Sequence, residues 1–208
     1  MSLGAQWRER LGERGFRLRI AVTVAALAAA LMSLARFLQW NEARSGVVLP
    51  DPFLAMYGPV DVTWLTFALI YGGLAGAVIL LAREPERLLM AIQGYAVMVG
   101  LRMVAMWLVP LEPPAAMIAL KDPFVEFFGG MAATLNKDLF FSGHTSTLFL
   151  LFLNVPGTAA RRIFLACTIA VACCVLAQHA HYAIDVVVAF PFAFAAYSIT
   201  RHLNRASA

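Results

Sequence analysis

Charged residues are scarce in this chain. Lys, Arg, Asp and Glu together make up 13% of the 208 residues, whereas hydrophobic residues make up 62%. An ordinary soluble domain is about 25% charged and about 45–50% apolar. The shortage of charge therefore excludes that class and indicates an integral membrane protein with a single domain.

Cysteine is also rare, and its placement excludes two further classes of protein. Cys167, Cys173 and Cys174 all lie in one apolar segment. Their spacing fits neither a disulfide framework nor a metal site, so we expect them to pack as small apolar residues. The sequence pI near 9.3 does not indicate nucleic-acid binding, because the basic residues lie in short segments between apolar runs.

Six apolar runs are candidates for membrane-spanning helices, which need about 20 mostly apolar residues. The predicted fold is all-α, with six transmembrane helices in one bundle over residues 20–203, between a basic segment, 1–19, and a tail, 204–208. The first run could instead be a signal peptide, but it is long for one. The predicted spans are Ile20–Leu38, Val62–Leu81, Leu88–Pro110, Leu139–Val155, Ile163–Gln178 and Ala183–Thr200.

Basic residues are distributed unequally between the two ends of these spans. One side of the membrane would carry only Arg44, Lys121 and Lys137. The other side would carry the arginines before the first span, between spans two and three, between spans four and five, and after the sixth span. This asymmetry predicts that both termini are cytoplasmic and that the fourth and sixth spans start on the exoplasmic side. A bacterial inner membrane with a periplasmic site fits this orientation, although a lumenal endomembrane site would look the same.

The connection between residues 111 and 137 contains two apolar pieces that are too short to span a membrane. These pieces are Ala115–Leu120 and Pro123–Leu135. We expect them either to lie in the membrane interface or to re-enter the membrane as a lid.

Two ionisable residues stand four positions apart where the sixth run begins. His181 and Asp185 would be neighbours on a helix, with Cβ atoms about 5–6 Å apart. A carboxylate there can bind one imidazole nitrogen and leave the other unprotonated, as a nucleophile or base. The alternative is a buried polar pair that only stabilises helix packing. Ionisable groups within membrane segments are nevertheless functional candidates by default.

The sequence Ser142-Gly143-His144-Thr145 stands near the start of the fourth run. Ser142 is a candidate N-cap, and the free N–H groups of a helix start suit a phosphate. A histidine there can protonate a leaving alkoxide. Ser-Gly-His alone is a weak signal, but together with the second motif at the same membrane face it indicates phosphoryl transfer.

Arg102 is the third element of the candidate site. It lies about 12 Å from the exoplasmic end of its span at 1.5 Å per residue. A guanidinium can bind phosphate bidentately, and the alternative is an arginine that snorkels or pairs with an acid. Asp138 is either a capping or a substrate-orienting group. The candidate substrate-binding residues are Arg102, Asp138, Ser142, Gly143, Thr145 and Tyr182, and the catalytic candidates are His144, His181 and Asp185.

The two motifs resemble those of the sphingomyelin synthase family, a C-terminal-type branch of the type 2 phosphatidic acid phosphatase superfamily. Its Cys-Gly-Asp-x-x-x-Ser-Gly-His-Thr motif is matched from Asp138 onward, with Asn136-Lys137 in place of Cys-Gly. Its His-Tyr-Thr-x-Asp-Val motif is matched at residues 181–186 except for Ala183. Leu49-Pro50-Asp51 is similar to a further family segment. The Arg-Pro dipeptide of the generic phosphatase branch is absent from the chain.

The resemblance implies a transferase. His181, oriented by Asp185, would attack the phosphorus of a phospholipid, and His144 would protonate the leaving diacylglycerol. The head group would then pass to ceramide, diacylglycerol or a related alcohol. No metal or cofactor is expected, because Arg102 and the helix start would hold the phosphate charge. The partners expected are lipids and no nucleic acid, and a homo-oligomer stays open.

Two alternatives to the transferase remain. One is a lipid phosphate phosphatase or a phospholipase C-like hydrolase on the same scaffold. The other is a non-catalytic transporter or lipid scaffold, for which ionisable residues would be expected at mid-depth on several helices.

Overall fold

The computed structural model describes residues 3–122 and 135–206, with side-chain placement given through residue 205. Within these residues the regular structure is entirely helical. The helices are α1 (Leu3–Gly12), α2 (Arg14–Glu42), α3 (Thr63–Leu81), α4 (Pro85–Leu108), α6 (Gly143–Asn154), α7 (Thr158–Ala177) and α8 (Ala183–Ala206), with a short 3-10 turn at Leu54–Met56. The predicted piece Pro123–Leu135 lies outside the described residues except for Leu135.

Five of the described helices are long and apolar enough to cross a membrane, which identifies the chain as an integral membrane protein. They are α2, α3, α4, α7 and α8. Their bounds extend the first and last predicted spans, because α2 already begins at Arg14 and α8 continues to Ala206.

The fourth predicted span, Leu139–Val155, is shorter than expected. Its helix, α6, begins only at Gly143 and has 12 residues, which corresponds to a length of about 18 Å. A hydrocarbon core is about 30 Å thick, so α6 by itself does not reach across it. The six-span bundle is therefore not confirmed by the described helices.

The short helix α6 forms the centre of the bundle. It contacts α3, α4, α7 and α8, and Leu148 and Leu150 on it are almost completely buried. Gly73 on α3 lets Leu148 approach, because a Cβ added to this glycine would lie 2.5 Å from the Leu148 side chain. Four longer helices therefore surround α6, and polar groups at its start are shielded from the surroundings.

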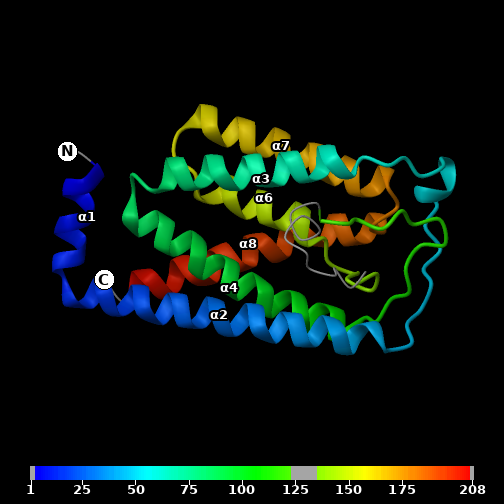
Figure 1. Cartoon of the computed structure of the whole chain (residues 1–208), viewed down its shortest axis with the longest axis horizontal. Coiled ribbons are helices and arrows are strands. Elements are labelled where there is room, and N and C mark those ends of the chain that lie inside the picture. The colour runs from blue at the N-terminus through cyan, green and yellow to red at the C-terminus, as the bar shows by residue number, and fades with distance from the viewer. Residues whose placement is uncertain (1–2, 123–134, 207–208) are drawn as a thin grey trace.

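Both termini lie at the same end of the bundle (Figure 1). Helix α6 ends toward that end, where Gly157 has a positive φ of 78° and leads into α7. The other end carries the connections from α2 to α3 and from α7 to α8. Helix α6 begins short of that second end, so its first turn is recessed within the bundle (Figure 1).

Candidate active site

The first turn of α6 is closed by its own side chains. Ser142 is the N-cap, and its Oγ accepts a hydrogen bond from the backbone N–H of Thr145 at 3.4 Å. The hydroxyl groups of these two residues are 3.0 Å apart. Both residues are fully buried. The predicted N-cap is thus confirmed, and the hydroxyl groups of both residues form their contacts within the first turn of α6.

His181 and Asp185 contact each other as the spacing predicts, although His181 lies just before α8 rather than on it. The imidazole Nδ1 is 3.0 Å from Asp185 Oδ2, and the backbone N–H of Tyr182 donates to the same oxygen at 3.1 Å. The carboxylate therefore reaches back over the helix start, as in a capping box. In the neutral tautomer that donates Nδ1–H to Asp185, the lone pair of His181 is on Nε2.

The two histidine rings of the separate motifs lie next to each other in an edge-on arrangement. The ring centroids of His144 and His181 are 6.2 Å apart, with an interplanar angle of 65°. The backbone N–H of Ser142 also donates to the carbonyl oxygen of Asp185 at 3.1 Å. The structure thus brings together His144, His181 and Asp185, as the sequence predicts.

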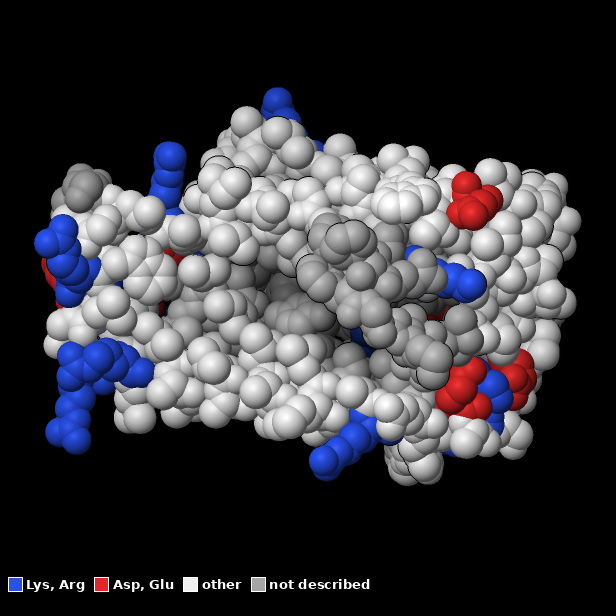
Figure 2. Space-filling model, viewed as in Figure 1, with Lys and Arg blue, Asp and Glu red and all other residues white. Residues whose placement is uncertain are grey.

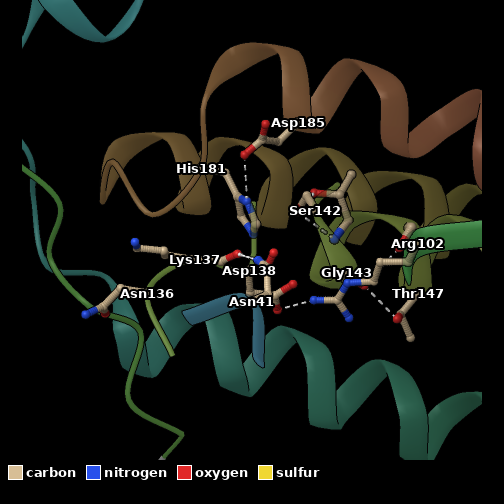
Figure 3. A network of polar contacts seen from close by, with 12 residues as sticks. Asn41, Arg102, Asn136, Lys137, Asp138, Ser142, Gly143, Thr147, His181 and Asp185 are labelled. Carbon is tan, nitrogen blue, oxygen red and sulfur yellow. Dashed lines mark hydrogen bonds and ion pairs between the residues drawn. The ribbon is translucent and has the colours of Figure 1, made fainter. Parts of the chain in front are cut away.

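Arg102 comes from α4 and lies against the start of α6 (Figure 3). Its guanidinium forms an ion pair with Asp138. A Cβ added to Gly143 would lie 2.5–2.8 Å from three guanidinium atoms, so any larger residue here would require the guanidinium of Arg102 to shift. The guanidinium Nε is buried and has no hydrogen-bond partner among the described residues. Arg102 is therefore acid-paired, yet it keeps a donor for a ligand.

The segment that carries Asp138 is held by the end of α2. One carboxylate oxygen of Glu42 accepts hydrogen bonds from the backbone N–H groups of Asn136 and Lys137, both at 3.0 Å. The side-chain amide of Asn41 donates to the carbonyl oxygen of Lys137 at 2.7 Å. Helix α2 thereby fixes the backbone next to Asp138 and, through it, the partner of Arg102.

A lysine ties the same segment to the loop that follows α4. Lys137 Nζ donates to Glu112 at 2.8 Å and to the carbonyl oxygen of Arg44 at 2.6 Å. Glu112 also accepts a hydrogen bond from the backbone N–H of Gly46. The hydrogen bond from Lys137, with that from Gly46, lowers the pKa of Glu112, so this carboxylate is charged at neutral pH.

Asp51 caps the start of α8 from a distant loop. Its Oδ2 accepts a hydrogen bond from the backbone N–H of Ala183 at 2.7 Å. Its Oδ1 accepts from the N–H groups of Phe53 and Leu54. Because Ala183 begins the helix that carries Asp185, this loop contributes to the placement of the His181–Asp185 pair.

Tyr182 has contacts that differ from those of a ligand-binding side chain. It is 2% exposed, and its hydroxyl donates to the carbonyl oxygen of Glu112 at 2.9 Å. The same hydroxyl accepts from the backbone N–H of Leu49. These contacts join two loops at the site end, so the predicted role in substrate binding stays a prediction without support from the contacts.

Sequence reasoning missed the supporting residues Asn41 and Glu42, and it noted Glu112 only within the stretch Pro110-Leu111-Glu112-Pro113, which resembles a family segment, without giving it a role. Asn41 and Glu42 follow the first apolar run and carry no motif, so only the three-dimensional structure relates them to Asp138. The signal that was available was Leu49-Pro50-Asp51, whose aspartate caps α8.

Among the described residues, no group of three or more His, Cys, Asp or Glu side chains is arranged to hold a metal ion.

A comparison with known protein families finds a match over the region of the candidate site. A family model described as PAP2 superfamily C-terminal matches residues 137–203, which include Asp138, His144, His181 and Asp185. No curated protein and no solved structure matches the chain. Members of this superfamily are phosphatases and phosphotransferases, so an enzymatic role in lipid phosphate chemistry fits the site. The match covers less than half of the chain, and it relates residues 137–203 to the PAP2 superfamily.

Proposed function

We propose that this protein is a lipid phosphotransferase similar to sphingomyelin synthases. It moves a phospho-head group from a glycerophospholipid to ceramide, diacylglycerol or a related alcohol. The observation that carries the proposal is the pair of adjacent imidazoles, His144 and His181, with Asp185 hydrogen-bonded to one of them. Two imidazoles on either side of one phosphorus supply the nucleophile and the acid that phosphoryl transfer needs.

The first step forms a phosphohistidine. The lone pair on Nε2 of His181 attacks phosphorus, and the bond from phosphorus to the diacylglycerol oxygen breaks. His144, as imidazolium, gives its proton to that leaving oxygen. Asp185 stabilises the positive charge that develops on His181 and keeps its Nδ1 protonated. The negative charge of the bound phosphate favours the imidazolium form of His144 before the step.

The second step reverses the roles. Neutral His144 removes the proton of the acceptor hydroxyl, whose oxygen attacks the phosphorus. The bond between phosphorus and Nε2 of His181 breaks, and the histidine returns to its starting form. Arg102 and the N–H groups at the start of α6 stabilise the charge on the phosphoryl oxygens in both steps. Arg102 already has a carboxylate partner. The phosphate therefore either binds Arg102 alongside Asp138 or takes the place of Asp138 as the partner of the guanidinium.

An apolar cavity near the site supports a lipid substrate. It has a volume of about 200 Å³ and lies between α2, α3, α4 and α6. Its lining includes Leu74, Tyr95, Leu150 and, at the site end, Thr147. The Thr147 hydroxyl donates to the carbonyl oxygen of Gly143 at 2.7 Å, which places this end one turn from the phosphate-binding candidates. Figure 2 shows a hollow on this face of the molecule.

The orientation in the membrane is part of the proposal. Lys and Arg side chains gather at the end that carries α1, whereas basic and acidic side chains lie together near the other end (Figure 2). The positive-inside rule then favours cytoplasmic termini and an exoplasmic site. Helix α6 would be the fourth of six membrane helices, embedded within the bundle, and its recessed start would keep the phosphate chemistry below the membrane surface.

The test is an assay of purified protein in vesicles. A phospholipid labelled in its head-group phosphate is supplied with and without ceramide or diacylglycerol, and His181→Ala is the inactive control. We expect label in a new lipid only when the acceptor is present. Label in water-soluble phosphate regardless of the acceptor would contradict the transferase and indicate a hydrolase, in which water takes the place of the alcohol in the second step.

A further inference from the structure

A polar cavity lies at the other end of the bundle from the imidazole pair. It has a volume of about 410 Å³ and is located where α6 ends and α7 begins. Its lining residues include Arg87, Asn154, Gly157, Arg161, Tyr197 and Arg201. It shares no lining residue with the candidate active site, so its role is separate from the proposed transfer reaction.

The charge around this cavity is uncompensated. No acidic residue is among its described lining residues. Arg87 is paired with Glu84 at 2.7 Å, but within the part of the chain that the structure describes neither Arg161 nor Arg201 forms an ion pair. Arg161 instead lies over the ring of Phe152. Two arginines without a carboxylate partner favour an anionic ligand.

A buried asparagine adds a second requirement to the ligand. Asn154 is 3% exposed, and its Nδ2 donates to the carbonyl oxygen of Leu150 at 2.8 Å. Its Oδ1 is buried and has no hydrogen-bond partner among the described residues. A buried acceptor without a donor costs roughly 1–3 kcal/mol. A fitting ligand therefore carries a hydrogen-bond donor as well as negative charge.

The position of the cavity favours a lipid over a soluble anion. Arg87 is two residues from the start of α4, and Arg161 is three residues from the start of α7. Both are therefore within about 5 Å of helix ends, at the level of lipid head groups. Met90 and Leu153 also line the cavity and offer apolar contact to acyl chains. Basic pockets between membrane helices are suited to anionic head groups.

We propose that this cavity binds a phosphoglycerol head group of an anionic phospholipid, from the leaflet on the side of the two termini. The phosphate lies between Arg161 and Arg201, and a glycerol hydroxyl donates to Asn154 Oδ1. A zwitterionic phosphoethanolamine would supply the donor without net negative charge. The head group of phosphatidylmethanol would supply the charge without the donor, so these two lipids separate the two requirements.

The test is native mass spectrometry of the full chain with defined lipids. We expect phosphatidylglycerol to be retained at least about tenfold better than phosphatidylcholine or phosphatidylethanolamine, a difference of about 1.4 kcal/mol. Arg161→Gln with Arg201→Gln should abolish this preference. The matched control is Arg162→Gln, which removes the same charge from the neighbouring position, is outside the cavity lining, and should leave retention unchanged.

The asparagine is tested separately with phosphatidylmethanol. The unmodified protein should retain phosphatidylglycerol better than phosphatidylmethanol, and Asn154→Leu should make the two equal. Equal loss in Arg162→Gln and Arg161→Gln would show general surface electrostatics and overturn the proposal. Retention of free glycerol phosphate as strong as that of the lipid would overturn the lipid assignment. A circular dichroism melt of each variant confirms that it is folded before its retention is scored.

Discussion

The backbone N–H of Ser142 donates a hydrogen bond to the carbonyl oxygen of Asp185, with a distance of 3.1 Å. This bond joins two motifs that are more than 40 residues apart in the sequence, and it involves only main-chain atoms. This main-chain bond therefore helps to fix the relative position of His144 and His181. Substitution of either imidazole should remove its chemistry without moving the other one.

The His181–Asp185 pair gives the first prediction. His181→Ala should abolish turnover, because it removes the proposed nucleophile and leaves His144 only its acid–base role. Asp185→Asn should lower kcat by about 10²–10⁴-fold, the usual range for acid–base groups, because the amide no longer holds the protonated Nδ1. Initial rates in lipid vesicles measure both effects. Full activity of His181→Ala would remove the nucleophile assignment.

His179 provides the matched control for His181. It is also buried, lies two residues away and packs against the ring of Tyr57 at a centroid distance of 5.2 Å. His179→Ala should retain most of the activity, because this ring contacts neither His144 nor Asp185 in the described structure. An inactive but folded His179→Ala would mean that the wrong one of the two neighbouring histidines has been assigned.

Arg102 and Gly143 give the second prediction. Arg102→Lys should lower kcat/KM at least about tenfold, because lysine cannot bind a phosphate oxygen pair bidentately. Gly143→Ala should have a similar effect, since the added methyl group would displace the guanidinium. The control is Gly72→Ala on α3, where a Cβ would have nothing within 4 Å. Unchanged kinetics in Gly143→Ala would show that the guanidinium can move without loss.

The contact between Glu42 and the segment before Asp138 gives the third prediction. Glu42→Ala removes the acceptor of two backbone N–H groups, and the loss of such bonds costs roughly 1–3 kcal/mol. Activity should fall because Asp138 and Arg102 are no longer held, and Glu42→Asp should restore part of it. Glu9→Ala, on α1, is the comparison variant and should behave like the unmodified protein in rate and melting temperature.

Tyr182 gives the fourth prediction, which distinguishes structural support from substrate binding. Tyr182→Phe removes two hydrogen bonds between loops and keeps the buried ring. The free energy of unfolding should fall by about 1–2 kcal/mol, while KM for the lipid should stay the same. A rise in KM without a change in melting temperature would instead assign the hydroxyl to the substrate.

The sequence predicts the central part of the site for a physical reason. Histidine and aspartate stand out in an apolar chain, so the motifs around His144 and His181 can be found without coordinates. The cap at Ser142 follows from its residue type. The five long helices are predicted equally well, because an apolar run long enough to span a membrane can adopt few structures other than a helix.

The supporting contacts could not be predicted in the same way. Glu42 acts on Asn136 and Lys137 through their backbone N–H groups, and such contacts leave no pattern in side-chain types. The length of α6 was overestimated, because Leu139 and Phe141 are apolar and buried yet lie in the irregular segment before the helix. Hydropathy records the burial of these residues but not the backbone conformation that leads to Ser142.

The most direct measurement is detection of the covalent intermediate with a lipid nitrophenyl phosphodiester. Its nitrophenolate leaves without a proton, so the first step no longer needs His144. The account predicts that His144→Ala forms a phosphohistidine at His181 and cannot pass it on, so the adduct accumulates and is detected by mass spectrometry at alkaline pH. Two results together would contradict the account. They are the absence of any adduct in His144→Ala and the release of nitrophenolate at the normal rate by His181→Ala.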